Sequence, residues 1–146
     1  MASEGMVHAL LLVHALLKPG GVLVNLHVAA EPPEIWLHAG ESEERIGYLL
    51  EKDQYIEYAQ SEDALARVQV QGWFELEKRS RFMFKTYAAS YDELQDFLTS
   101  VWSDAELLPQ VKMRSTATAA RLGPVRKAHL REIVNIMRLA RCDTPG

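Results

Sequence analysis

Hydrophobic residues fall into short runs that are separated by turn residues along the chain. The first run, Met6–Leu17, is apolar nearly all round at helical spacing, which predicts a helix that protein covers on more than one side. Lys18-Pro19-Gly20-Gly21 ends this helix, because proline cannot continue the helical hydrogen-bond ladder. Val22–Val28 follows as a nearly continuous apolar run, a pattern typical of a strand buried on both faces of a parallel sheet.

The middle of the chain predicts a hairpin, a helix and a long strand. Two short apolar segments, Ile35–His38 and Ile46–Leu50, flank a polar turn, so residues 31–53 are expected to form a hairpin-like insertion. Hydrophobic spacing predicts a helix over about 55–71, which the following glycine stops. Alternating apolar and charged residues then predict a strand over 73–87.

The C-terminal third contains two helix-start signals and one ambiguous segment. Ser90-Tyr91-Asp92-Glu93 matches a capping box, and apolar residues follow it at helical spacing. Ser103-Asp104-Ala105-Glu106 repeats the pattern and predicts a further helix through about Arg121. Residues 125–140 fit a helix by their apolar spacing, but their isoleucines and valine also favour a strand.

Composition narrows the class of protein. A chain of 146 residues, 48% of them hydrophobic and 25% charged, is expected to be one globular domain over residues 1–146. The net charge of -4 provides no overall positive field, so neither nucleic acid nor a membrane is expected as a partner, although basic residues concentrate near the C-terminus. Met6–Leu17 is too short to span a bilayer. The single cysteine, Cys142, cannot form a disulfide within the chain, which favours a cytoplasmic protein.

Two motifs, together with the order of the predicted helices and strands, suggest a family. Leu17-Lys18-Pro19-Gly20-Gly21 joins the first helix to a buried strand, and Gly72-Trp73-Phe74 precedes the long strand. This order resembles the C-terminal half of a class I S-adenosylmethionine-dependent methyltransferase, over nearly the whole chain. The resemblance implies that Val22–Val28 is the fifth strand of a seven-stranded sheet. It further implies that Trp73–Tyr87 and Glu132–Leu139 are the sixth and seventh strands, which form the family's antiparallel pair, so residues 125–140 are assigned a strand.

The implied fold class is α/β, a partial Rossmann-like methyltransferase sheet with flanking helices and the inserted hairpin. The family holds its cofactor on a glycine-rich loop after the first strand and on residues after the second to fourth strands, and nothing before Met1 supplies these. Gly20-Gly21 cannot replace them, because such a loop must follow a strand and open onto a helix N-terminus. No cofactor-binding residue is therefore expected in the isolated chain, although S-adenosylmethionine is implied for the full-length family.

Three residues are candidates for chemistry or binding. His27 lies at the C-terminal end of the predicted parallel strand and shares a face with Asn25, where an imidazole can act as a general base or bind a substrate hydroxyl. The alternative is a partly buried histidine that a backbone carbonyl satisfies. Trp36 can contact an apolar or aromatic acceptor, or can seal the insertion against the sheet. No other histidine has a recognised metal-ligand spacing, so no metal site is expected.

Three functions are compatible with these features. The first is a truncated methyltransferase-like protein whose ancestor methylated a small molecule, and which is inactive alone because methyl transfer requires donor and acceptor to be aligned by both halves. The second is an interaction module, in which an exposed edge of Val22–Val28 pairs with a second copy or with a separate N-terminal half. The third is a small-ligand-binding domain with a pocket near His27 and Trp36.

Overall fold

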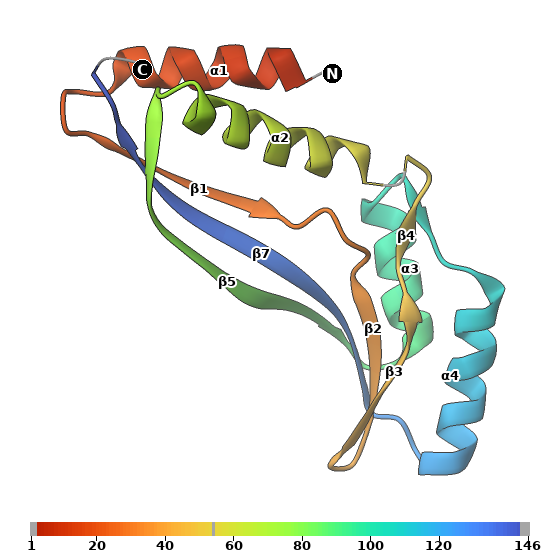
Figure 1. Ribbon diagram of the computed structural model, residues 1–146. Coiled ribbons are helices and arrows are strands. Elements are labelled where there is room, and N and C mark those ends of the chain that lie inside the picture. The colour runs from red at the N-terminus through yellow and green to blue at the C-terminus, as the bar shows by residue number, and fades with distance from the viewer. Residues whose placement is uncertain (1–2, 54, 144–146) are drawn as a thin grey trace. The chain divides into compact units, whose positions relative to one another are not determined.

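The computed structural model describes residues 3–53 and 55–143. These residues form four helices and seven strands (Figure 1). In chain order these are α1 (Ser3–Leu16), β1 (Val22–Val28), β2 (Glu34–Ala39), β3 (Ser42–Tyr48), β4 (Leu50–Glu51), α2 (Ile56–Val70), β5 (Phe74–Ala88), α3 (Tyr91–Val101), β6 (Ala105–Glu106), α4 (Pro109–Leu122) and β7 (Lys127–Arg141). Five strands form one open, mostly antiparallel sheet, and β4 pairs with β6 separately. The protein is therefore a mixed α/β structure.

The described residues divide into two compact units. The first unit comprises the described parts of Met1–Ala30, Ile56–Phe82 and Val134–Gly146, and the second comprises those of Glu31–Tyr55 and Met83–Ile133. The sequence instead predicts a single domain with a small insertion at 31–53. That insertion is only the beginning of the second unit, because the helices α3 and α4 join the hairpin around a core of their own.

In the first unit, α1 and α2 pack against each other and against one face of the strands (Figure 1). Leu23 of β1 and Met137 and Leu139 of β7 point toward these helices, as alternation along a strand requires. The core consists of Leu65, Val68, Phe74, Met137 and Leu139, bordered by Val7, Leu10, Leu11, Leu17, Leu23 and Trp73.

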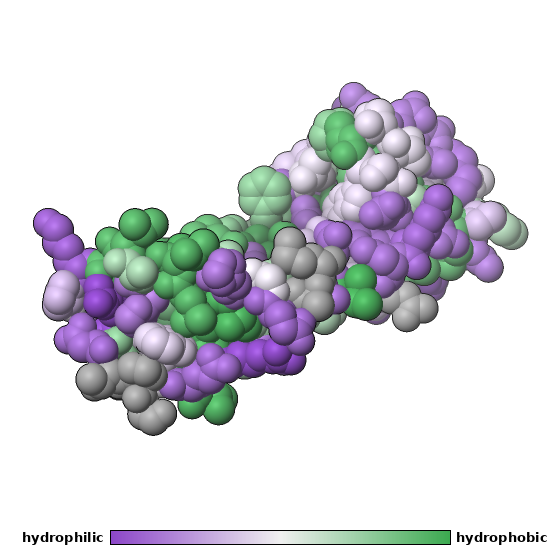
Figure 2. All heavy atoms as spheres, turned by 90° about the horizontal axis from the view of Figure 1, so that it is seen from above, coloured by the Kyte–Doolittle hydropathy of each residue, from purple (hydrophilic) through white to green (hydrophobic). Residues whose placement is uncertain are grey.

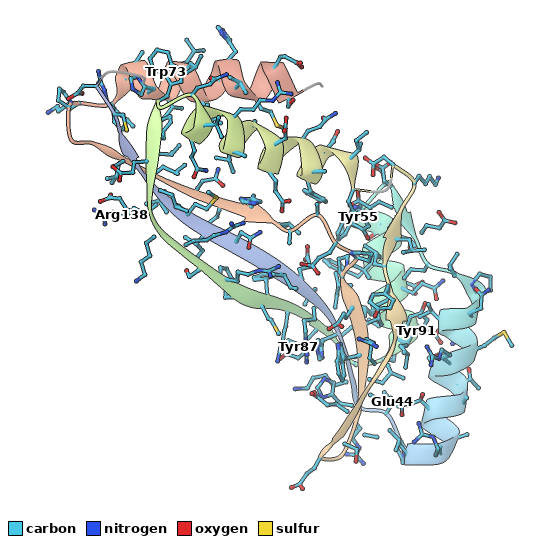
Figure 3. All side chains as sticks on the ribbon, viewed as in Figure 1. Glu44, Tyr55, Trp73, Tyr87, Tyr91 and Arg138 are labelled. Carbon is cyan, nitrogen blue, oxygen red and sulfur yellow. The ribbon has the colours of Figure 1, made fainter. Side chains whose placement is uncertain are left out.

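The C-terminal end of α1 is fixed by a buried histidine. The His14 Nε2–H donates to the carbonyl oxygen of Cys142 over 2.7 Å. Its ring lies edge-on to that of Trp73, which is labelled in Figure 3, with 5.0 Å between centroids. The outer side of α1 remains apolar, since Leu12 and Leu16 are 55% and 85% exposed, and hydrophobic atoms occupy much of the surface of the first unit in Figure 2. Within the described residues, no helix combines the length and hydrophobicity that a membrane crossing needs.

The prediction that β1 is buried on both faces in a parallel sheet is wrong, whereas the open edge expected under the interaction-module hypothesis is present among the described strands. β1 pairs antiparallel with β7, from Val22 opposite Ala140 to Val28 opposite Val134, and β7 is its only ladder partner among the described residues. One face of β1 carries Leu23 toward the helices, whereas Val24 and Leu26 on the other face are 53% and 57% exposed. A short apolar run does not distinguish an interior strand from an edge strand, because periodicity reports hydrophobicity and not hydrogen-bond partners.

Gly20 and Gly21 form the tight turn that precedes β1. Gly20 has a φ of 77°, which residues with a side chain rarely adopt. A Cβ atom on Gly21 would lie 2.8 Å from the Lys18 carbonyl oxygen, which also accepts a hydrogen bond from the Gly21 N–H. The tight turn between α1 and β1 thus explains the two glycines of the Lys-Pro-Gly-Gly sequence.

In the second unit, the hairpin of β2 and β3 lies beside the N-terminal part of β7. β2 pairs antiparallel with both strands, so the predicted hairpin is confirmed and is also an integral part of the sheet. Gly40, with a φ of 63°, begins its two-residue loop. The helices α3 and α4 cover one face, and the core consists of Ile35, Leu37, Ile46, Leu49, Tyr91, Leu94, Leu98, Val111, Ala128 and Leu130.

Of the two predicted helix starts, only the first is confirmed. The Ser90 hydroxyl accepts from the Glu93 N–H over 3.1 Å, and the Glu93 carboxylate accepts from the Ala89 N–H over 2.7 Å. The helix predicted to begin at Ser103 is wrong in its first turns, because residues 105–106 form β6 against β4 and α4 begins at Pro109. Pairing with β4 supplies hydrogen bonds that outweigh the local capping signal at this point.

The ambiguous segment 125–140 is a strand, as the sequence analysis assigned it. β7 pairs with β5 as well as with β1 and β2. Glu77 contacts Arg138 in the first unit and Tyr87 contacts His129 in the second, so β5 and β7 run in opposite directions. The antiparallel arrangement expected of these two strands is thus present.

The first unit offers a matched test of its core. Phe74 is 1% exposed, whereas Phe84 on the same strand is 53% exposed. We expect Phe74→Ala to lower the free energy of unfolding by about 3 to 5 kcal/mol, since it removes a buried ring and leaves a cavity, and Phe84→Ala to lower it by less than about 1 kcal/mol. Urea unfolding followed by circular dichroism measures both. Equal losses in the two variants would contradict the assigned core.

Candidate functional site

The first candidate site lies in the first unit around His27. Because alternate residues of a strand share a face, β1 places Asn25 and His27 on the side that α2 covers. The His27 Nδ1–H donates to Asn25 Oδ1 over 2.8 Å. The structure thus brings together the two residues that the sequence predicted to act together, and they form a hydrogen-bonded pair.

The second ring nitrogen of His27 meets a carboxylate and an amide. His27 Nε2 lies 3.7 Å from Glu62 Oε1 of α2 and 3.4 Å from Asn135 Nδ2 of β7. Burial lowers the pKa of His27 below its usual value; the Glu62 carboxylate acts in the opposite direction, and the Arg79 guanidinium lowers the pKa further. His27 is therefore satisfied by side chains, and the predicted backbone-carbonyl partner is replaced by Asn25.

A small cavity of about 110 Å³ adjoins this cluster. His27, Glu62, Gln69 and Arg79 supply its polar lining, and Leu65, Ala66 and Met137 supply the apolar part. Sites for small organic ligands usually have volumes of about 300 to 1,000 Å³, so this cavity fits a few water molecules or a small ion. His27 Nε2 and Glu62 are 3.7 Å apart, beyond hydrogen-bond distance, so their interaction is electrostatic.

The third predicted residue, Trp36, belongs to the second unit and forms part of a different cluster. Trp36 of β2 stands directly opposite His129 of β7, and their rings are parallel to within 2° at a centroid distance of 6.2 Å. The Arg131 guanidinium carbon lies 4.3 Å from the centre of the Trp36 ring, and the indole N–H donates to Glu34 over 3.3 Å. Its partners are thus polar and charged, whereas the sequence suggested an apolar acceptor or a seal.

Two histidines meet beside Trp36. His38 Nε2 and His129 Nδ1 are 2.5 Å apart, and Glu43 Oε2 lies 3.5 Å from His38 Nδ1. The carboxylate favours a proton on His38 Nδ1, so His38 Nε2 accepts from the His129 Nδ1–H. This assignment leaves His129 Nε2 as a lone pair that is buried and without a hydrogen-bond partner among the described residues.

Electrostatics keep His129 neutral. Its side chain is fully buried, and burial is the first cause that lowers its pKa to about 4, followed by the charges of His38, Arg131 and Lys85. Burial also lowers the pKa of His38, against the raising effect of Glu43. A neutral His129 can therefore hold His38 by a hydrogen bond at neutral pH without adding charge.

Sequence reasoning missed His129 and Arg131 as partners of Trp36, and Tyr87 as a partner of His129. Tyr87, labelled in Figure 3, contacts the His129 ring at a centroid distance of 5.4 Å. The available signal was the alternation Glu34-Trp36-His38 in one strand and Lys127-His129-Arg131 in another. These rows come together only when the register between β2 and β7 is known, and that register depends on residues about ninety positions apart.

The described residues contain no group of three or more His, Cys, Asp or Glu side chains arranged to hold a metal ion. Comparison of the chain with protein-family models, with curated proteins and with solved structures finds no match in any of the three.

The buried pair predicts a pH dependence of stability. Because the folded-state pKa of His129 is about 4 and its usual value is 6.5, the unfolded chain binds a proton below pH 6.5 that the folded chain does not. The free energy of unfolding should therefore fall as the pH decreases from 6.5 to about 4, by about 1 to 3 kcal/mol from this group.

Urea titrations of the wild type and of His129→Asn across this pH range measure the effect. The substitution removes the titrating group, so the stability of the variant should depend less steeply on pH, whatever its stability at pH 7. Identical slopes in the two proteins would show that folding does not lower the pKa of His129.

Proposed function

We propose that this chain is an assembly module, built on a half-sheet like the C-terminal half of a class I methyltransferase. The observation that carries the proposal is the one-sided pairing of β1. Its seven residues pair with β7, and no other described strand pairs with its second edge. Backbone N–H and C=O groups along such an edge are free to pair with a further strand.

The side chains of β1 support association at this edge. Val24 and Leu26 are each more than half exposed, although they lie in a strand of mostly aliphatic residues. A long edge strand with exposed apolar side chains and no charged residue lacks the usual features that prevent pairing with another chain. Polar Asn25 and His27 do not provide such protection, because they point to the face that α2 covers.

A second copy of the chain is the partner that β1 fits best. If two β1 strands pair antiparallel about a twofold axis at Asn25, Val24 of each copy stands opposite Leu26 of the other. The four half-exposed side chains then form one apolar cluster, and Leu23 stands opposite His27 on the other face. Twofold self-pairing of this kind is the commonest way in which identical chains associate.

A separate N-terminal half is the alternative partner. It is favoured by the order of the elements, because a helix, a Lys-Pro-Gly-Gly turn, β1 and the antiparallel strands β5 and β7 follow one another as the resemblance implies. In that arrangement the open edge of β1 would adjoin the strands that carry the cofactor loop. The ancestral activity would be methyl transfer to a small molecule.

Methyl transfer by the chain alone is not part of the proposal. The three connections that lead from a strand into a helix are residues 52–55, 89–90 and 107–108, and none of them contains glycine. A loop that lets its backbone approach a nucleotide cofactor at a helix N-terminus normally requires glycine there. A small-ligand-binding function is also less well supported, because the cavity beside His27 is small and Trp36 has its contacts in the second unit.

Self-association can be tested by a charge on the edge. We expect the wild type to dimerise and Val24→Lys to raise the dissociation constant at least about tenfold, because a lysine would be desolvated beside the partner's Leu26. Val70→Lys on α2 is the matched control, since Val70 is 88% exposed and belongs to a helix and not to the β1 edge. Sedimentation velocity over a range of concentrations measures the constants. A monomeric wild type, or equal effects of the two substitutions, would contradict the second copy as partner.

The binding of S-adenosylmethionine tests whether the isolated chain lacks a cofactor site. Equilibrium dialysis with labelled S-adenosylmethionine should detect no saturable binding at cofactor concentrations up to about 1 mM, which corresponds to less than about 4 kcal/mol of binding free energy. A protein known to bind the cofactor serves as the positive control. Saturable binding that His27→Ala abolishes would show that the first unit contains a complete cofactor site.

A further inference from the structure

A second surface, in the second unit, has a different chemistry from the β1 edge. In this unit α3 and α4 cover the face formed by Ile35, Leu37, Ala128 and Leu130. The alternate residues of β2 and β7 therefore point to the other face, where the ladder sets Glu34 opposite Arg131, Trp36 opposite His129 and His38 opposite Lys127. β3 adds Arg45 opposite Trp36, and β5 adds Tyr87 beside His129. We call Trp36, Tyr87, Arg45, Lys85, Lys127 and Arg131 the aromatic-basic face.

Aromatic rings and cations alternate on this face. The buried His129 ring lies between Trp36 and Tyr87, at 6.2 Å from the first and 5.4 Å from the second. The Lys127 ammonium lies 4.7 Å from the centre of the Tyr87 ring, as Arg131 lies over Trp36. Tyr87 is 53% exposed, so a large part of its ring is accessible to a ligand.

The charge of the face is opposite to that of the chain. Four cations, Arg45, Lys85, Lys127 and Arg131, face two carboxylates, those of Glu34 and Glu43, on a chain whose net charge is -4. Arg45 pairs with Glu34 at 2.8 Å, and Arg131 approaches Glu43 at 3.7 Å. Within the described residues, Lys85 and Lys127 form no carboxylate ion pair and account for the excess positive charge.

We propose that the aromatic-basic face binds single-stranded nucleic acid. A base would stack on the exposed ring of Tyr87, and phosphates would be bound by Lys85, Lys127 and the neighbouring arginines. Stacking on aromatic side chains combined with cations along the backbone is how proteins bind single strands with little sequence preference. The cations lie on three strands, β3, β5 and β7, so phosphates that follow one another along a nucleic acid chain can each meet a cation.

This inference departs from the expectation, drawn from net charge, that nucleic acid is not a partner. Net charge describes the field far from the protein, whereas salt screens that field within about 10 Å and leaves a local patch effective at contact. The face is also independent of the proposed assembly function. It involves residues of the second unit only, whereas the open edge of β1 belongs to the first unit.

Fluorescence anisotropy with a labelled oligouridylate of about ten nucleotides tests the inference on the full chain. We expect saturable binding at about 50 mM salt that weakens with a logarithmic slope of about -2 to -3, as three or four phosphate contacts to a single strand would give. Lys85→Gln and Lys127→Gln should each reduce the slope by about 0.7, whereas Lys112→Gln, which removes a lysine paired with Asp92 on the helical side, should leave it unchanged.

The stacking contribution has a closely matched control. Tyr87→Ala should weaken binding about fivefold to a hundredfold. Phe84→Ala should change it less than about twofold, because Phe84 is equally exposed at 53% but lies an odd number of residues from Tyr87 and points to the opposite face of β5.

Three results would overturn the inference: no saturable binding at about 50 mM salt, equal losses in Tyr87→Ala and Phe84→Ala, or competition by uridine monophosphate as strong as by the oligonucleotide. Val24→Lys should bind the oligonucleotide as the wild type does. A failure at the β1 edge and a failure at the aromatic-basic face are therefore distinguishable.

Discussion

Backbone hydrogen bonding along β7 is the constraint on which the structure depends. Lys127–Arg141 pairs with β2 through its first residues, with β1 through its last, and with β5. Buried N–H and C=O groups must be paired, and an interior strand meets this requirement only while its neighbours stay in register. The same strand supplies Ala128 and Leu130 to the core of the second unit, and Met137 and Leu139 to the core of the first. Loss of its register would therefore affect both cores and the two histidine clusters.

The sequence predicted those parts of the fold whose signals are local. Ser90 and Glu93 are three residues apart and cap α3 through their own hydrogen bonds, and the glycines before β1 are required by the turn that they form. The prediction failed where a distant partner decided the outcome. The apolar run Val22–Val28 predicts a strand of a parallel sheet, but its partner β7 runs antiparallel to it. The capping pattern at Ser103 is overridden by the pairing of residues 105–106 with β4. A local residue pattern does not show which distant strand will pair with a segment.

The candidate sites divide in the same way. Asn25 and His27 are two residues apart in one strand, so alternation alone placed them together, and they form a hydrogen bond. Trp36 was identified, but its surroundings were not, because His129 reaches it across the ladder between β2 and β7. The spacing of the five histidines likewise gave no indication that two of them, His38 and His129, would be hydrogen-bonded. The register between β2 and β7 brings the alternating residues of the two strands together, and they form a cluster of rings and cations.

The two histidine environments limit the proton chemistry that these two side chains can supply. His27 has side-chain partners at both ring nitrogens, and its cavity has room for little more than water. His129 is held neutral by burial and by neighbouring cations, so it cannot exchange protons near neutral pH. Neither imidazole is therefore free to serve as a general base for a substrate, whereas the exposed groups around them are strand edges, aromatic rings and cations. These are groups that proteins use to associate with other chains and with polyanions.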